Sequence, residues 1–417
     1  MGHVARWIIG LAVALLIGTT ALVLLALQAE PSVASPAVVE PRDVERALRL
    51  ARAHDPRRAL PGIVRSLRLS QHEAELLIGQ AVARMAGGRV QLELPGASVR
   101  LRASLPLPWP VDRRWINVDL QAVAGQDLPV LQSVRVGSLP VPVVLAKGLI
   151  GRLAASYGLA GLDRQAVLDL QRVRFGPGQL HVVYAWGPEA PKRLLAVLSP
   201  QGDPARLRVY AERLAALTAP PAPSLDIPLP TVLGPMFELA RQRSRAGSDP
   251  AVENRTVLWV LGLVSGGVGL GTMLPEREAE LRRRPITFTL AGRRDFPQHF
   301  LASANIAADS GGLLADRVGL VKELDDARFG SGFSFNDLAA NRAGTRFGEF
   351  AVRDPAGLQG RLLGGVAEHD ILPDLSDLPE FLHEREFRQR YGGPGSPAYE
   401  RLTADIERRV MATPLFR

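Results

Sequence analysis

Residues 295–348 read DFPQHFLASANIAADSGGLLADRVGLVKELDDARFGSGFSFNDLAANRAGTRFG, and this stretch decides the fold of the C-terminal half of the chain. Apolar residues recur in it at helical spacing, which predicts three consecutive helices. The first is expected over 298–308 and the second over 313–324. A Gly-Ser-Gly loop then precedes a third helix, which starts at Ser334.

Two polar side chains of these helices require specific partners. His299 lies one helical turn before Ser303, so both face the same side of the first helix. Glu323 falls at the expected C-terminal end of the second helix, where the helix dipole disfavours a carboxylate. We therefore expect His299, Lys322 or an arginine to lie against Glu323.

The start of the third helix carries a capping signal. Ser334 and Asp337 have the spacing of a capping box, in which each side chain accepts a hydrogen bond from the other residue's backbone N–H. Asn341 follows one turn after Asp337 on the same face. Gly344 and Gly348 are four residues apart, which allows this helix to pack closely against a neighbour.

Four interpretations of His299, Glu323 and Asp337 stay open at this point. They could be an acid–base pair with an electrostatic partner, a metal site, a site that binds a ligand or lipid headgroup, or a buried polar network that locks three helices together. One histidine and two carboxylates at these spacings are a weak metal signature, so we assign no metal and no cofactor. Ser303 is a weak candidate for a nucleophile, because it is not in a Gly-x-Ser-x-Gly motif. His299, Glu323 and Asp337 remain candidates for catalysis without an assigned role.

The composition excludes several kinds of protein. The chain has 417 residues and a net charge of +8, with 47% hydrophobic and 22% charged residues, which is sufficient for two or three folded domains. The absence of cysteine excludes disulfides, thiolate metal sites and a cysteine nucleophile. The basic charge favours anionic partners, but no nucleic-acid-binding motif is present, so we expect no nucleic-acid partner.

The N-terminus indicates a location. Residues 7–27 form a run of 21 residues without a charge, long enough to cross a membrane as a helix. Arg6 precedes this run, so the positive-inside rule keeps the N-terminus in the cytoplasm. We expect residues 1–28 to be a single-pass anchor in the inner membrane, with the bulk of the chain on the periplasmic side. A cleaved signal peptide ending near Ala29 is the alternative.

The remaining chain predicts an α+β fold followed by a mainly helical domain. Its expected parts are a tether with a short helix over 29–60, a curved antiparallel-sheet domain over 61–218, a proline-rich linker over 219–234, and a mainly helical domain over 235–417.

Within 61–218 the spacing of the apolar residues changes from three or four residues, as in a helix, to two, as in a strand. Ser70 and Glu73 have capping-box spacing ahead of a helix that ends near residue 85. Apolar and polar residues then alternate, which predicts antiparallel hairpins with one solvent-exposed face. Strands are expected near 90–94, 99–103, 115–123, 130–136, 173–175 and 180–186, and helices near 143–157 and 204–217.

A second apolar run in the chain, residues 257–274, has 18 uncharged residues and is rich in glycine. Its length is near the lower limit for a membrane span, while its glycines lower its hydrophobicity. A buried core helix and a second membrane span are therefore the two alternatives for this run.

Two short motifs in the first domain resemble those of the YpmS-like envelope proteins. They are Leu-Ser-x-x-Glu at 69–73 and Val-Gly-x-Leu-Pro-x-Pro at 136–142. The resemblance covers roughly residues 65–160. It implies a curved-sheet architecture that binds lipid.

The helical domain has an ordered polar set of its own. Asp-x-x-x-His-Phe at 295–300, Lys-Glu-x-x-Asp at 322–326 and Gly-Ser-Gly-Phe-Ser-x-x-Asp-Leu-x-Ala-Asn-x-x-Gly at 330–344 resemble the YfiM-like lipoproteins and, more distantly, the VanZ-like membrane proteins. The equivalent positions are Asp295, His299, Phe300, Glu323, Arg328, Ser334, Asp337, Asn341 and Gly344. The ligand-binding candidates are Asp295, His299, Lys322, Glu323, Arg328, Ser334, Asp337 and Asn341.

This second resemblance implies a place in the cell envelope and, through the VanZ-like proteins, a link to glycopeptide resistance, but no established reaction. The chain departs from the VanZ-like pattern in hydrophobicity. Asp309, Asp316 and Arg317 interrupt helices that would face lipid in that family, so a soluble or interfacial version is expected.

These observations together predict a membrane-anchored bacterial envelope protein with a non-enzymatic binding or structural role, with lipid or an envelope glycan as the ligand. The alternative is an envelope hydrolase that uses His299 and Glu323 in acid–base chemistry. The two differ in geometry. An enzyme requires these residues beside an open cleft, whereas a structural network is sealed from solvent.

Overall fold

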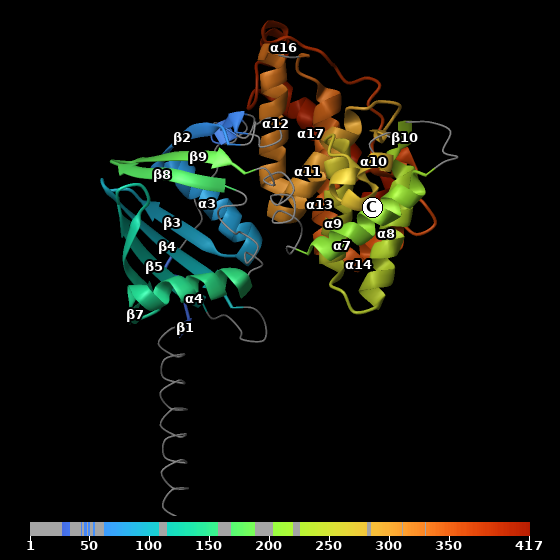
Figure 1. Cartoon of the computed structure of the whole chain (residues 1–417). Helices are drawn as coiled ribbons and strands as arrows, with labels where there is room; N and C mark the ends of the chain where they lie inside the picture. The colour runs from blue at the N-terminus through green and yellow to red at the C-terminus, as the bar shows by residue number, and fades with distance from the viewer. Residues whose placement is uncertain are drawn as a thin grey trace, which may run out of the picture. The chain divides into compact units, whose positions relative to one another are not determined.

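The computed structural model describes residues 27–33, 43, 46–47, 49–50, 53–54, 62–107, 115–156, 168–187, 203–219, 226–281, 285–310, 312–329 and 331–417. They belong to two compact units (Figure 1). The sheet unit comprises the described part of Met1–Val39 and Ala51–Val197, and the helical unit that of Glu40–Leu50 and Leu198–Arg417. The chain therefore combines antiparallel sheets with a helical C-terminal region, as the sequence predicts.

The larger sheet of the sheet unit is an antiparallel meander. Its strands, in spatial order, are β3 (Arg89–Glu93), β4 (Ser98–Pro106), β5 (Trp115–Val123), β6 (Val130–Val136) and β7 (Leu139–Val141). Alternation sets the two faces, as shown by Val90 and Leu92, which are buried. The short strand β1 (Leu27–Gln28) also joins this sheet and pairs antiparallel with β5.

A three-stranded sheet completes the unit, in the order β2 (Val64–Ser70), β9 (Gln179–Trp186) and β8 (Leu168–Gly176). Helix α3 (Gln71–Ala86) follows β2 and packs on β3. The capping box that the sequence predicts is present. The Ser70 side chain accepts from the Glu73 backbone N–H, and the Ser70 N–H donates to the Glu73 carboxylate at 2.7 Å. Helix α4 (Val143–Ser156) packs against β6.

The chain enters this unit differently from the sequence-based expectation of a free tether. The backbone N–H of Ser32 donates to Asn117 Oδ1 at 3.0 Å, and that of Val33 donates to Ser104 Oγ at 3.1 Å. Val33 is itself buried. Residues 29–33 therefore dock on the sheet, because buried polar groups of β4 and β5 satisfy their backbone.

The expected end of the anchor at residue 28 is wrong, because Leu27 and Gln28 are a strand of the sheet. Residues 1–26 and 34–42 lie outside the described residues, and Leu27–Gln28 forms β1. Among the helices of the described ranges, none is both long enough and apolar enough to cross a membrane.

The helical unit is built around a long buried helix, α13 (Phe335–Arg353), which packs on α9, α11, α12 and α17. The other principal helices are α7 (Pro204–Leu217), α8 (Leu229–Arg245), α9 (Pro250–Ser265), α11 (Phe296–Ser310), α12 (Gly312–Phe329), α14 (Pro355–Arg361), α16 (Glu384–Tyr391) and α17 (Pro397–Met411). The strands β10 (Asp226–Pro228) and β11 (Thr287–Thr289) form a short parallel pair. Two further short helices are α10 (Glu278–Leu281) and α15 (Glu368–Ile371).

Helices α11 and α13 approach each other very closely through two glycines. A Cβ atom added to Gly344 would lie 2.0 Å from the carbonyl oxygen of Phe300, and one added to Gly348 would lie 2.1 Å from that of Ala304. Both obstacles are backbone atoms of α11, which a rotamer change cannot move. The close packing predicted from the spacing of these glycines is therefore confirmed.

Two parts of the helical unit differ from the sequence-based expectations, and a third matches one of two expected alternatives. Helix α7 packs on α8 and α9, whereas the sequence analysis placed it in the sheet domain. Strand β10 and the first turns of α8 occupy the expected linker, since α8 tolerates Pro235 inside it. The apolar run 257–274 forms the buried second half of α9 followed by a short 3-10 turn, which matches the alternative of a core helix.

Candidate functional site

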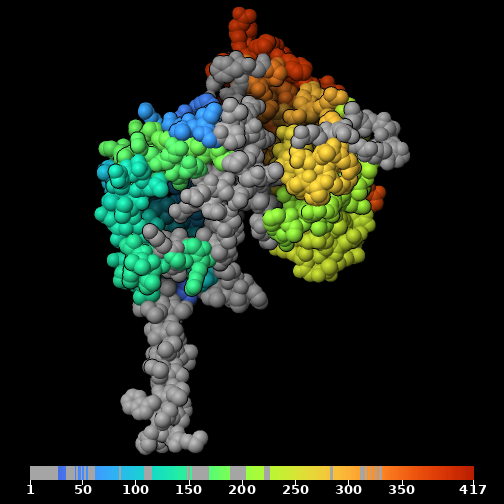
Figure 2. All heavy atoms as spheres, viewed as in Figure 1, coloured from blue at the N-terminus to red at the C-terminus, as the bar shows by residue number. Residues whose placement is uncertain are grey.

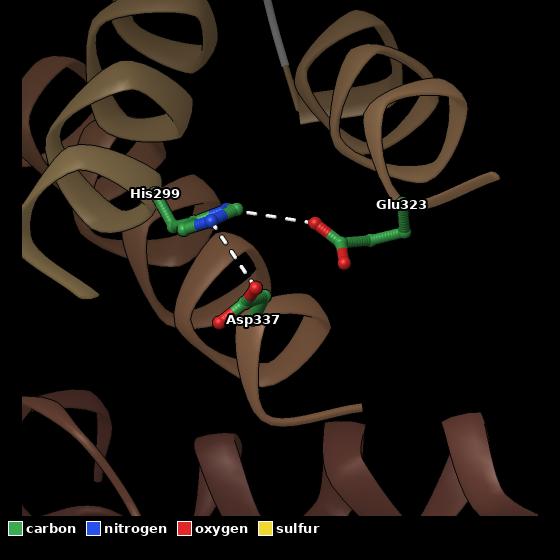
Figure 3. Close-up of side chains that lie close together, drawn as sticks. All are labelled: His299, Glu323 and Asp337. Atoms are coloured by element: carbon green, nitrogen blue, oxygen red, sulfur yellow. Dashed lines mark ion pairs between the residues drawn. The ribbon is translucent and has the colours of Figure 1, made fainter. Parts of the chain in front are cut away.

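Three consecutive helices bring the predicted polar residues together, as Figure 3 shows for His299, Glu323 and Asp337. His299 comes from α11, Glu323 from α12 and Asp337 from α13. The side chain of His299 is 5% exposed, that of Glu323 is 0% exposed and that of Asp337 is 10% exposed. The three helices thus enclose one polar centre, which we call the His299 centre (His299, Lys322, Glu323, Asp337 and Asn341).

The reason given in the sequence analysis for a partner of Glu323 is wrong, although the expected partner is present. Helix α12 continues to Phe329, so Glu323 lies inside it and not at its C-terminal end. Burial, and not the helix dipole, is the reason that this carboxylate needs a partner. Its Oε1 lies 3.6 Å from His299 Nδ1, and its Oε2 accepts from the Ser334 backbone N–H at 3.4 Å.

Only half of the expected capping box forms at the start of α13. Ser334 Oγ accepts from the backbone N–H of Asp337 at 3.0 Å. The Ser334 N–H is directed to Glu323, and the Asp337 carboxylate lies against the imidazole instead, with Oδ2 3.4 Å from His299 Nε2. The packing of α12 and α11 against the cap therefore redirects the carboxylate into the centre.

Hydrogen bonds fix the tautomer of His299. Lys322 Nζ lies 3.1 Å from Nε2, and an ammonium group can only donate, so Nε2 accepts. Nδ1 then carries the proton and donates to Asn341 Oδ1 at 3.2 Å. Asn341 Oδ1 also accepts from Ser303 Oγ at 3.0 Å, which holds the amide in that orientation. The imidazole consequently presents a basic Nε2 toward Lys322 and Asp337.

Burial shifts the protonation of all three titratable groups in the direction of the neutral form. It raises the pKa of Glu323 to about 8, with the negative charge of Asp337 adding to the effect. It raises the pKa of Asp337 to about 6, helped by Asp295. It lowers the pKa of His299 to about 4, with the Lys322 ammonium as the next cause. His299 is therefore a neutral base at pH 7.

Asp295 lies beside the centre and is linked to Asp337 by Arg293, a residue that the sequence did not single out. Arg293 Nη2 contacts Asp295 Oδ2 at 2.5 Å, and the same nitrogen lies 3.8 Å from Asp337 Oδ1. Burial acts to raise the pKa of Asp295, but hydrogen bonds from Arg293 outweigh it and leave that pKa below its ordinary value. Arg293 also pairs with Glu380. Of the remaining candidates, Arg328 has a side chain outside the described residues.

No local signal points to Arg293 and Glu380 as partners. Glu380 lies 87 residues after Arg293, in the segment between α15 and α16. In the structure this segment is extended: the Phe335 N–H donates to the Pro379 carbonyl at 2.9 Å, and Phe333 forms a bridge with Leu382. It therefore runs over the start of α13, and only α16 becomes helical.

The donor set of the His299 centre is chemically suited to a cation. One nitrogen of His299 and one carboxylate oxygen each of Glu323 and Asp337 lie within 4.8 Å of one another. Within the part of the chain that the structure describes, Glu323 Oε1, Asp337 Oδ1 and Asn341 Nδ2 are buried and have no hydrogen-bond partner. Such atoms are uncommon in native proteins, and a bound ion is one explanation for them.

Comparisons with known proteins give no match for this chain. Searches with the chain find no matching family model, no matching curated protein and no matching solved structure. The resemblances in the sequence analysis consequently stay predictions, and the site has to be interpreted from its own contacts.

Proposed function

We propose that this chain is a membrane-tethered protein of the bacterial cell envelope with a non-enzymatic binding role, and that its ligand is lipid. Residues 7–26, the part of the uncharged run that precedes β1, supply a single-pass anchor, and Arg6 before them keeps the N-terminus in the cytoplasm. The sheet unit and the helical unit then both lie on the periplasmic side.

The observation that supports lipid as the ligand is the exposed apolar surface of the sheet unit. Seven of the ten large apolar side chains exposed among the described residues belong to it. They are Ile63, Val64, Leu77, Leu128, Val130, Val144 and Leu145. The larger share of exposed apolar side chains in this unit supports an apolar partner for it. Acyl chains are the apolar partner that a membrane-tethered protein meets at highest concentration.

Helix α4 is the most apolar part of this surface. Val144 is 88% exposed and Leu145 is 64% exposed. The helix packs on β6, where Val130 is also exposed. Figure 2 shows α4, in blue-green, at the surface of the sheet unit.

The start of the sheet unit supports a position of this surface near a bilayer. Leu27, the last residue of the uncharged run, already pairs with Ile116 of β5. Because an extended residue spans only about 3.3 Å, a sheet that begins where the anchor ends has little freedom to move away from the headgroups.

Mass spectrometry of the full-length protein purified in detergent tests the ligand. We expect copurifying lipid in the wild type and less of it in the double variant Val144→Ser, Leu145→Ser. The matched control is Leu363→Ser, Met411→Ser, which removes exposed apolar side chains of the helical unit. Equal lipid in all three proteins would contradict the proposal, and a copurifying glycan in place of lipid would replace the ligand class.

Cell fractionation tests the location independently. We expect the protein in the inner-membrane fraction, and we expect protease added to spheroplasts to remove both units. A full-length product that stays soluble and protected would contradict the tether, whatever the lipid experiment gives.

The alternative, an envelope hydrolase using His299 and Glu323, rests on one observation. A buried carboxyl with a raised pKa next to a neutral imidazole is a pattern found in acid–base catalysis. The side chains are at most 10% exposed, which favours the sealed arrangement over an open catalytic cleft. Hydrolysis of an envelope ester, amide or glycoside by the wild type that His299→Gln abolishes would establish the alternative.

A further inference from the structure

We propose that His299, Glu323 and Asp337 bind one divalent transition-metal ion, zinc being the ion that fits best, and that Lys322 occupies the cation position when the ion is not bound. This inference concerns the helical unit and does not depend on the proposed lipid binding.

The donor atoms are close to the separations that a common ion imposes. Zinc binds imidazole nitrogen and carboxylate oxygen at about 2.0–2.2 Å, so adjacent ligand atoms of a tetrahedral site lie about 3.4 Å apart. His299 Nε2 and Asp337 Oδ2 are separated by 3.4 Å. The whole set, with Glu323, lies within 4.8 Å. Glu323 Oε1 is 3.6 Å from His299 Nδ1, so the Glu323 carboxylate has to move toward Nε2 to complete a three-ligand site.

The surroundings of His299 are those of a metal-bound imidazole. A ligating histidine usually donates its other ring N–H to an oxygen that fixes the ring and its tautomer. Here Nδ1–H donates to Asn341 Oδ1 at 3.2 Å, and Ser303 holds that amide at 3.0 Å. Nε2 is thereby left as the nitrogen without a proton, and its lone pair faces the Lys322 ammonium. Asn341 and Ser303 thus have a role as positioning residues for the metal site.

Lys322 indicates where the ion lies. Its ammonium nitrogen is 3.1 Å from His299 Nε2 and 3.9 Å from Glu323 Oε1, so it already occupies the cationic position of the centre. It is also 3.0 Å from Asp326 Oδ2, and its side chain is 42% exposed. Lys322 can therefore leave the imidazole and keep Asp326 as its partner when an ion enters.

Charge and hydrogen bonding favour an ion over a purely structural network. Two buried carboxylates carry a charge of −2 when ionised, which one divalent ion balances. Of the cations beside them, Lys322 is shared with Asp326, and Arg293 reaches Asp337 only at 3.8 Å. Glu323 is fully buried, and its Oε1 has no hydrogen-bond partner among the described residues. An ion supplies the partner that this oxygen lacks. The single nitrogen ligand favours zinc over magnesium, which prefers a shell of oxygens.

Calorimetric titration of the full-length protein in detergent with ZnCl₂, after treatment with EDTA and its removal, tests the site. We expect one equivalent of zinc to bind, zinc to raise the melting temperature, and magnesium at the same concentration to do neither. His299→Gln and Glu323→Gln should each weaken zinc binding by at least about tenfold. The matched control His369→Gln, whose side chain is 80% exposed, should bind zinc as the wild type does.

Lys322→Met separates a metal site from a structural network. Removal of the competing ammonium should tighten zinc binding by at least about tenfold, because one positive charge leaves the site. A network held by Lys322 would only lose stability. Since Lys322 is partly exposed, this variant should fold even if Glu323→Gln does not. Zinc binding that persists in His299→Gln, or that Lys322→Met leaves unchanged or weakens, would overturn the proposal.

Discussion

The sheet unit and the helical unit use polar and apolar groups in opposite ways. Among the described residues, thirteen of the fifteen buried polar or charged residues lie in the helical unit, as do the twelve largest fully buried side chains. The sheet unit instead exposes seven of ten large apolar side chains. The helical unit therefore buries its polar groups and pairs them with one another, whereas the sheet unit leaves apolar surface for a partner. Glycine, buried charge and surface charge should consequently have different effects in the two units.

Glycine substitution should distinguish the units most strongly. Gly344→Ala places a Cβ 2.0 Å from the Phe300 carbonyl oxygen, so α11 and α13 must separate. We expect the helical unit to lose on the order of 4 kcal/mol or more, at the high end for overpacking because the obstacle is backbone. Thermal melting followed by circular dichroism measures the loss.

Gly151→Ala in α4 of the sheet unit is the matched control for this substitution. Nothing lies within 4 Å of the added Cβ. Alanine should then stabilise the helix by about 0.5–1 kcal/mol. Equal losses in both variants would show that the contact between α11 and α13 is not what limits Gly344.

Removal of a buried charge should have the next largest effect. Glu253 of α9 is fully buried, accepts from Tyr210 Oη at 2.6 Å and pairs with Arg206 and Arg243 at 3.2 and 3.0 Å. Glu253→Ala should cost about 2–3 kcal/mol, less than for a fully buried pair because both arginines are partly exposed. Urea denaturation measures the cost.

Glu238→Ala removes an exposed carboxylate of α8 and serves as the control. It should change stability by less than about 0.5 kcal/mol. A comparable loss in Glu238→Ala would mean that the buried network does not join α7, α8 and α9.

The His299 centre should show coupling between its members. Measured in EDTA, Glu323→Ala should cost about 1–3 kcal/mol, because it leaves the Ser334 N–H without its acceptor and removes the carboxylate beside His299. His299→Ala in the same chain should recover part of that loss. Melts of the two single variants and the double variant decide the matter, and strictly additive losses would show that the residues do not form one centre.

Surface charge in the sheet unit should have the smallest effect. The Arg100 guanidinium, 3.0 and 2.5 Å from Asp119, holds the pKa of that carboxyl below its ordinary value. Because the pKa of Asp119 is depressed on folding, its contribution is present above the unfolded value of about 3.9 and is lost as the pH falls through the folded value. Both side chains are partly exposed, so solvent screens the pair. Asp119→Asn should therefore lower the melting temperature slightly at pH 7 and not at pH 2, and a large loss at pH 7 would contradict the comparison.

Much of the local structure could be predicted because its causes are local. The alternation of Val90 and Leu92 and the capping box of Ser70 and Glu73 each act within a few residues, and the structure confirms both. The strands expected at 115–123 and 130–136 coincide with β5 and β6. Pro235 illustrates the limit of such signals, since tertiary packing keeps it inside α8.

The candidate site was predictable in its members but not in its physical basis. Spacing alone selected His299, Glu323, Asp337 and Asn341, which the structure brings together. The length of α12 was not evident from its sequence, because Glu323 is followed by two aspartates that look like the end of a helix. Burial of Glu323 depends instead on helices packed around it from other parts of the chain.

The sequence by itself determined where most helices and strands begin and end, the uncharged run at the N-terminus, and the close approach that Gly344 and Gly348 permit. The tertiary structure decided which charges are buried and which partners they meet. Arg293 finds Glu380, and Glu253 finds Tyr210, over distances along the chain at which no periodic pattern acts. The reason is physical: capping and amphipathic spacing act over one or two turns, whereas desolvation of a charge depends on everything that packs against it.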